Sequence, residues 1–332
     1  TASVTGLIGS QLASLTTTQT AGLSTDIVAS LNTNAIGSLT TAQIAALTTD
    51  QAANLTTTTV KALTTRQIAV LENEDLAVLT SENVAALTSV QLQALTTSQI
   101  AGLSSQQVFD LNSTTLQALT TRQVAALETR DVAAMSTVSL SNLLSTQLQA
   151  LTTAQIAGLS SQQLVDLSTT TLKNLASSQI AAIETTDISA LTTVQLRALS
   201  SVQQQALTTA QVSNLTNEQL LGLSSTALGS LTTQQLSALN ATKLNNLDTA
   251  SVTGLIGSQL ASLTTTQTAG LSTDIVASLN TNAIGSLTTA QIAALTTNQA
   301  ANLTTTTVKA LTTKQIAVLE NEDLAVLTSE NV

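Results

Sequence analysis

The sequence contains no cysteine, histidine, proline, tryptophan or tyrosine, and its only aromatic residue is Phe109. These absences exclude disulfides, thiolate or imidazole metal sites, haem ligation by histidine and stacking on aromatic side chains. Charge is also sparse, because 9 basic and 19 acidic residues give a net charge of −10 in 332 residues. Nothing provides the basic footprint of a nucleic-acid-binding protein, and an acidic surface disfavours anionic membranes.

Long apolar runs are missing as well. Ile68-Ala69-Val70-Leu71 is typical of the longest, whereas a membrane-spanning helix needs roughly 18 apolar residues. There is no glycine-rich phosphate loop either. We therefore expect no nucleic-acid partner, no membrane insertion of this segment and no cofactor.

The dominant feature is a leucine at every eighth residue. From Leu7 to Leu327 this ladder occupies 41 positions, is broken only by Met135 and Ile183, and contains no insertion or deletion. A short fixed period indicates one structural unit copied along an axis, with each copy burying its apolar side against its neighbours.

Each repeat, or octad, is numbered from the residue after the leucine, so that residues 40–47 form one octad. The pattern is Thr/Ser, Thr/Ser, variable, Gln, Ile/Val/Leu, variable, small, Leu, and Gln holds position 4 in 23 of the 42 octads sampled. Thr at position 1 with Gln three residues later is a capping box, and the flanking Leu and position-5 aliphatic form a hydrophobic staple. The sequence thus predicts a new helix start in every octad.

Two other architectures compete with short helices. In one continuous helix, eight residues turn about 800°, so the apolar stripe would slip about 80° per octad and face every direction. A β-solenoid is the stronger alternative, because Thr, Val and Ile favour strands. Two observations oppose it. In a strand, the side chains of positions 5 and 8 would point to opposite faces, and Gln, Ala and Leu favour helix.

We therefore predict an all-α solenoid with one two-turn helix of about seven residues per octad. Positions 5 and 8 point inward, and small residues at position 7 let neighbouring backbones approach. Positions 3 and 6 face solvent or a partner chain, because they carry the charged residues Asp50, Lys61, Arg66, Glu82, Arg122, Lys173 and Arg197.

Longer repeats lie above the octad. Residues 250–332 copy residues 2–84, an offset of 248 residues, with only Asp50→Asn298 and Arg66→Lys314 changed. We expect residues 1–332 to be one continuous array and a fragment of a longer protein. A fainter 56-residue period relates Glu72, Glu128 and Glu184, each followed by an aspartate at position 4: Asp75, Asp131 and Asp187. If a superhelical turn takes about 3.5 or 7 octads, these carboxylates line up along one side.

Familiar catalytic chemistry is poorly supplied. Without His or Cys, a nucleophile would have to be an activated Ser or Thr, and the hydroxyls are accounted for as helix caps. We therefore expect no catalytic residues and no enzymatic activity. The carboxylates Glu72, Glu74 and Asp75, repeated at Glu320, Glu322 and Asp323, are a weak calcium candidate. Acidic residues that complement the dipole of a first helical turn explain them better, so no metal site is expected.

Residues 39–47 and 151–159, with their Leu-Thr-Thr-Ala-Gln-Ile-Ala core, resemble the Thr-rich octapeptide arrays of large bacterial surface or secreted proteins described as adhesins. The resemblance covers the whole chain and implies export, great length and a structural or adhesive task. We expect an extracellular or cell-surface structural protein that self-associates into a filament, stalk or fibre. The alternative is an adhesin-type module that presents a repeated Thr/Ser face to polysaccharide or ice.

Overall fold

The computed structural model describes residues 7–327, and over this range it contains forty short helices and no strand. The all-α prediction is confirmed, and the β-solenoid is excluded for the described part of the chain. The helices fall into two compact units, and the chain passes from the first to the second between Leu167 and Ser168. The octad pattern runs through this boundary without interruption, so the prediction of one continuous array rests on the sequence.

The helices of the first unit are α1 (Gly9–Ala13), α2 (Thr17–Ala21), α3 (Thr25–Ala29), α4 (Thr33–Ser38), α5 (Thr41–Ala45), α6 (Thr49–Ala53), α7 (Thr57–Ala62), α8 (Thr65–Ile68), α9 (Asn73–Val78), α10 (Ser81–Ala85), α11 (Ser89–Ala94), α12 (Thr97–Ala101), α13 (Ser105–Phe109), α14 (Ser113–Ala118), α15 (Thr121–Ala126), α16 (Thr129–Ala134), α17 (Thr137–Ser141), α18 (Ser145–Ala150), α19 (Thr153–Ala157) and α20 (Ser161–Asp166).

Those of the second unit are α21 (Thr169–Asn174), α22 (Ser177–Ala182), α23 (Thr185–Ile188), α24 (Thr193–Ala198), α25 (Ser201–Ala206), α26 (Thr209–Asn214), α27 (Asn217–Leu221), α28 (Ser225–Ser230), α29 (Thr233–Ser237), α30 (Ala241–Leu244), α31 (Thr249–Val252), α32 (Gly257–Ala261), α33 (Thr265–Ala269), α34 (Thr273–Ala277), α35 (Thr281–Gly285), α36 (Thr289–Ala293), α37 (Thr297–Ala301), α38 (Thr305–Ala310), α39 (Thr313–Ile316) and α40 (Asn321–Ala325).

The predicted capping box starts nearly half of the described helices. At α12 the Thr96 N–H donates to Gln99 Oε1 at 2.7 Å, and the Gln99 N–H donates to Thr96 Oγ1 at 3.1 Å. The preceding helix ends because two consecutive residues are extended, Leu95 at φ −62°, ψ 136° and Thr96 at φ −71°, ψ 161°. The predicted helix length of about seven residues is wrong for this reason. Two extended residues in each octad leave at most six for the helix.

Positions 5 and 8 form the core, as predicted. Ile100 and Leu103 are fully buried, and the same two positions are buried in nearly every described octad. Small residues at position 7 permit close packing against position 2 of the octad three before. A Cβ added to Gly270 would lie 2.5 Å from the Cβ of Ala241, a distance that real contacts do not reach.

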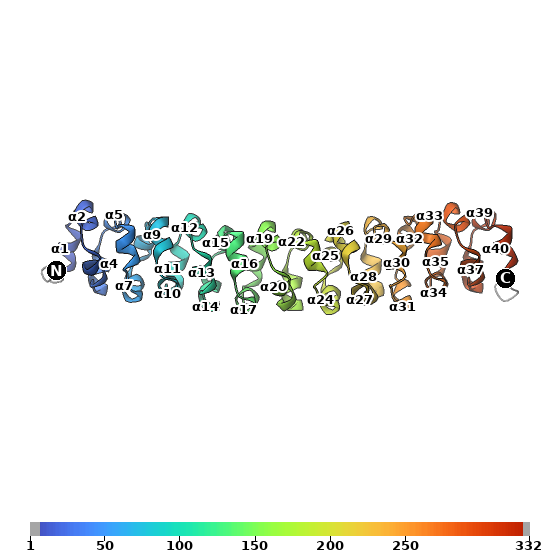
Figure 1. Ribbon diagram of the computed structural model, residues 1–332, viewed down its shortest axis with the longest axis horizontal. Coiled ribbons are helices and arrows are strands. Elements are labelled where there is room, and N and C mark those ends of the chain that lie inside the picture. The colour runs from blue at the N-terminus through green and yellow to red at the C-terminus, as the bar shows by residue number, and fades with distance from the viewer. Residues whose placement is uncertain (1–6, 328–332) are drawn as a thin grey trace. The chain divides into compact units, whose positions relative to one another are not determined.

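Within each unit, a helix packs on the helix three octads away, as in the pairs α1·α4, α4·α7 and α9·α12 of the first unit and α21·α24 and α35·α38 of the second. Successive helices therefore wind around an axis, with more than three helices in each superhelical turn. In the first unit, Figure 1 shows α5, α12 and α19 along the upper edge and α10 and α17 along the lower edge. Helices seven octads apart thus return to the same side of the unit.

Candidate functional site: the glutamine ladder and the acidic octads

The position-4 glutamines connect successive superhelical turns. Gln99 is 2% exposed, and its Nε2 donates to the backbone carbonyls of Ile68 at 2.9 Å and Leu71 at 2.7 Å. These acceptors lie 31 and 28 residues earlier, at positions 5 and 8 of the octad four before. Packing at three octads and hydrogen bonding at four together place one superhelical turn between three and four octads.

The same connection recurs along both units, and we call it the glutamine ladder. In the first unit the donor Nε2 atoms belong to Gln43, Gln51, Gln67, Gln91, Gln99, Gln107, Gln123, Gln147, Gln155 and Gln163. In the second they belong to Gln203, Gln211, Gln219, Gln235, Gln259, Gln267, Gln291, Gln299 and Gln315.

Each ladder glutamine serves two purposes at once. Its Oε1 caps its own helix, while its Nε2 donates to two carbonyls at the end of a helix in the preceding turn. The position-5 carbonyl also accepts from the position-8 N–H of its own octad, as Ile68 does from Leu71. The glutamine therefore chiefly satisfies the position-8 carbonyl, which lies beyond the last helical donor. Sequence reasoning identified only the cap. The sequence does contain one signal for the second role: no octad has Glu at position 4. A capping box accepts Glu as readily as Gln, so capping alone does not explain the absence of Glu. A carboxylate lacks the donor that the ladder requires.

Other donors at position 4 act in the same way. Asn83 is 3% exposed, and its Nδ2 donates to the carbonyl of Leu55, 28 residues earlier, at 2.7 Å. Lys243 Nζ donates to the carbonyl of Leu215, again 28 residues earlier. The position-8 carbonyl of the octad four before is therefore the common acceptor.

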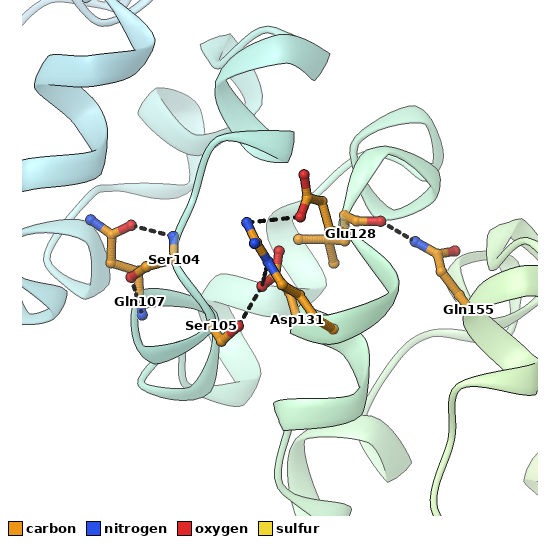
Figure 2. Close-up of polar contacts among 8 residues, drawn as sticks. Ser104, Ser105, Gln107, Glu128, Asp131 and Gln155 are labelled. Carbon is orange, nitrogen blue, oxygen red and sulfur yellow. Dashed lines mark hydrogen bonds and ion pairs between the residues drawn. The ribbon is translucent and has the colours of Figure 1, made fainter.

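The acidic octads place an acceptor where the ladder has a donor. Asp75, Asp131 and Asp323 occupy position 4 and are 2%, 0% and 2% exposed. One oxygen of Asp131 accepts a hydrogen bond from Ser105 Oγ at 2.7 Å, beside the capping box of Ser104 and Gln107 (Figure 2). The Oδ2 atom of each of the three aspartates is buried without a hydrogen-bond partner.

Electrostatics differ between two of these octads. Burial, together with the nearby charges of Glu72 and Glu74, raises the pKa of Asp75 to about 6, and a hydrogen bond from Thr49 opposes the rise. The octad of Asp131 has Arg130 where that of Asp75 has Glu74. The Arg130 guanidinium lies 2.8 Å from Glu128 Oε2 and 3.6 Å from Asp131 Oδ1.

The three residues of the calcium candidate do not converge. Glu72 and Glu74 are exposed, whereas Asp75 is buried. Within residues 7–327, no group of three or more acidic, His or Cys side chains is arranged to hold a metal ion. The octad of Asp323 repeats this sequence, with Glu320 and Glu322 exposed and Asp323 buried.

Positions 3 and 6 lie on the outer surface, as predicted. The charged residues on which that prediction was based, Asp50, Lys61, Arg66, Glu82, Arg122, Lys173 and Arg197, are all exposed. Four valines also occupy position 3 and are 63–65% exposed: Val90 and Val138 in the first unit, and Val194 and Val202 in the second.

Two open depressions on the surface each contain a single titratable side chain. One of about 540 Å³ in the second unit is lined by residues 189–193 and 216–219, and Glu218 is its only titratable side chain. One of about 400 Å³ in the first unit includes Asp166 as its only titratable side chain. Neither brings an acid and a base together. No helix among the described residues has the length and apolar character needed to cross a membrane.

Of the comparisons with known proteins, a family model agrees with this geometry. A sequence search of curated proteins finds no match to the chain. The family model named ALTTAQ repeat matches residues 25–57, 68–105, 124–161, 180–217 and 274–305. Residues 150–155 read Ala-Leu-Thr-Thr-Ala-Gln, which in the structure is the end of one octad followed by the cap and the ladder glutamine of the next. The matches cover more than half of the 332 residues, and the chain therefore belongs to the ALTTAQ-repeat family.

Proposed function

We propose that this chain is a non-enzymatic, extracellular structural segment that forms a filament, stalk or surface fibre by self-association. The glutamine ladder is the observation that carries the proposal. Gln43 and Gln155 make the same two inter-turn hydrogen bonds to the octad four before. Any number of octads can be added without a new kind of contact, which suits a protein whose task depends on length.

The exposed valines support lateral self-association. Val90, Val138, Val194 and Val202 lie at a position that carries charged or polar residues in most octads. Burying a valine side chain fully yields about 1.5–3 kcal/mol, so a few such contacts repeated along a long array can hold two chains together. The sparse charge of the surface lowers the repulsion between like chains.

The proposed setting is the bacterial cell surface or the extracellular space. It rests on the resemblance to Thr-rich octapeptide arrays of adhesin-like proteins and on a cysteine-free composition that suits export. The proposed partners are copies of the chain itself, and surface polysaccharide is a second candidate.

Electron microscopy and sedimentation velocity test self-association. Purified chain is examined over a range of concentrations, and we expect ordered fibres or a concentration-dependent increase in mass. Replacing the four exposed valines by threonine should weaken assembly and leave the melting temperature unchanged, because these side chains lie outside the core. The matched control is Asn34→Ser with Asn282→Ser, which alters exposed position-3 side chains without removing a methyl group. A chain that stays monomeric at every concentration would contradict the proposal.

A binding module is the alternative, and the repeated hydroxyls favour it. Thr96 and Thr97, at positions 1 and 2, are both exposed, and the pattern recurs in most octads. The cap hydroxyl accepts from its own backbone, which leaves it less suited to a flat ligand-binding face. Monodisperse monomers that bind a polysaccharide on a glycan array or reshape ice crystals would favour this alternative over the filament.

A further inference from the structure

The acidic octads interrupt the glutamine ladder in a specific way. At position 4, Asn83 donates from Nδ2 to the carbonyl of the residue 28 before it, at 2.7 Å. Aspartate has the same shape as asparagine, so Asp75 is placed to make the equivalent contact with the carbonyl of Leu47. An ionised carboxylate has no proton to donate, and Asp75 Oδ2 accordingly lacks a hydrogen-bond partner.

A carboxylate oxygen that takes the place of the Asn83 amide nitrogen meets a carbonyl oxygen, and two acceptors need a proton or a cation between them. A single proton fits, because at the equivalent position the Asn83 donor and its carbonyl acceptor lie at hydrogen-bonding distance. A metal ion fits poorly, because the nearby Glu72 and Glu74 are exposed and the described residues gather no three-ligand metal group.

We propose that Asp75 forms a proton-dependent link of the ladder. The protonated carboxyl donates from Oδ2 to the carbonyl of Leu47, 28 residues before it, and closes the connection between turns. The ionised carboxylate opens that connection and leaves a buried charge. The array is therefore tighter in acid than at neutral pH at this octad.

The charges around Asp75 favour the proton. Two carboxylates, Glu72 and Glu74, belong to its own octad and act together with burial to raise its pKa to about 6. Two of the neighbouring helices carry no titratable side chain: α12, which packs on α9, and α5, four octads before it. Each of the other surrounding helices contributes one titratable group, namely Asp50 in α6, Arg66 in α8, Glu82 in α10 and Asp110 directly after α13.

The sign of the effect follows from the raised pKa. Asp75 binds a proton more tightly in the folded chain, where its pKa is about 6, than in the unfolded chain, where an aspartate has its ordinary pKa of 3.8. Its contribution to stability is therefore fully present below about pH 4 and is lost as the pH rises through about 6.

The test compares the full chain with the variant Asp75→Asn. Asparagine supplies the donor at every pH, as Asn83 does. The matched control is Asp26→Asn, which removes the same charge from an exposed position-3 residue of the same unit. Hydrogen exchange of the α9 amides is measured by mass spectrometry on dilute, monomeric protein, and each variant is compared with the unaltered chain at the same pH.

At pH 7.5 we expect about tenfold more protection of α9 in the Asp75 variant than in the unaltered chain, and near-equality at pH 4. The control should differ little at either pH. The reverse variant Asn83→Asp should reduce the protection of α10 at pH 7.5 and not at pH 4.

Two results would overturn the proposal. One is a ratio between the Asp75 variant and the unaltered chain that is the same at both pH values. The other is a gain in protection of the unaltered chain, but not of the variant, on adding millimolar calcium at pH 7.5, because a cation would then occupy the site. A failure of self-association would leave this readout unaffected, since it is taken on monomers.

Discussion

Replacing Gln235 by glutamate tests whether the ladder stabilises the array. Gln235 is 2% exposed, and its Nε2 donates to the carbonyls of Gln204 at 2.9 Å and Leu207 at 2.6 Å, while its Oε1 accepts from the Thr232 N–H at 2.7 Å. Gln235→Glu keeps the cap and removes both inter-turn donors. The neighbouring Gln234 is exposed and makes no ladder bond, so Gln234→Glu adds the same charge to the same helix turn.

The expected magnitude follows from these contacts. Each of the two lost hydrogen bonds costs about 1 kcal/mol, and the Leu207 carbonyl, left without a donor, costs about 1–3 kcal/mol more. The Gln204 carbonyl keeps the Leu207 N–H as a donor at 3.2 Å. Because the carboxylate also lies against two carbonyl oxygens, we expect Gln235→Glu to lower the local free energy of unfolding by about 3–5 kcal/mol. The control should stay within about 0.5 kcal/mol, since the helix dipole acts similarly on both substitutions.

Urea unfolding followed by circular dichroism, together with hydrogen exchange of residues 201–207, measures the difference between the two variants. The loss of protection in Gln235→Glu should reach the octad that ends at Leu207, far from the substitution in sequence. Equal effects of Gln234→Glu and Gln235→Glu would refute the argument, because they would show that the inter-turn donors add nothing beyond the cap.

Three further substitutions test the other parts of the octad. Thr96→Ala removes a cap hydroxyl and should lower stability by about 1 kcal/mol, whereas Thr97→Ala, at the exposed position 2, should change it little in the same urea titration. Ile100→Ala empties a fully buried position and should cost about 2–5 kcal/mol by thermal unfolding; a cost below 1 kcal/mol would mean that the core repacks freely. Gly254→Ala would drive a Cβ into the backbone of Ser225, and a variant as stable as the unaltered chain would contradict the close approach of positions 7 and 2.

Local features of the octad could be predicted from the sequence because they depend on neighbours within a few residues. The cap of Thr96 by Gln99 and the burial of Ile100 are of this kind. The ladder could not be predicted, because it joins residues 28 and 31 apart, and that separation depends on how many octads complete a superhelical turn. The burial of Asp75 was missed for the same reason: in an isolated helix its carboxylate is simply a first-turn acid beside the positive end of the dipole.

The 56-residue period acquires a physical meaning once the turn is known. Helices pack on those three octads away and bond to those four away, so seven octads complete about two superhelical turns. Three family matches begin at residues 68, 124 and 180, each 56 residues after the last, and within the first unit Asp75 and Asp131 are separated by the same interval. Loss or gain of any whole octad preserves the ladder, since every octad offers the same carbonyls. Only a change of seven octads also keeps surface residues on their original side. A feature that recurs every 56 residues within a unit therefore returns to the same side of that unit after every two superhelical turns.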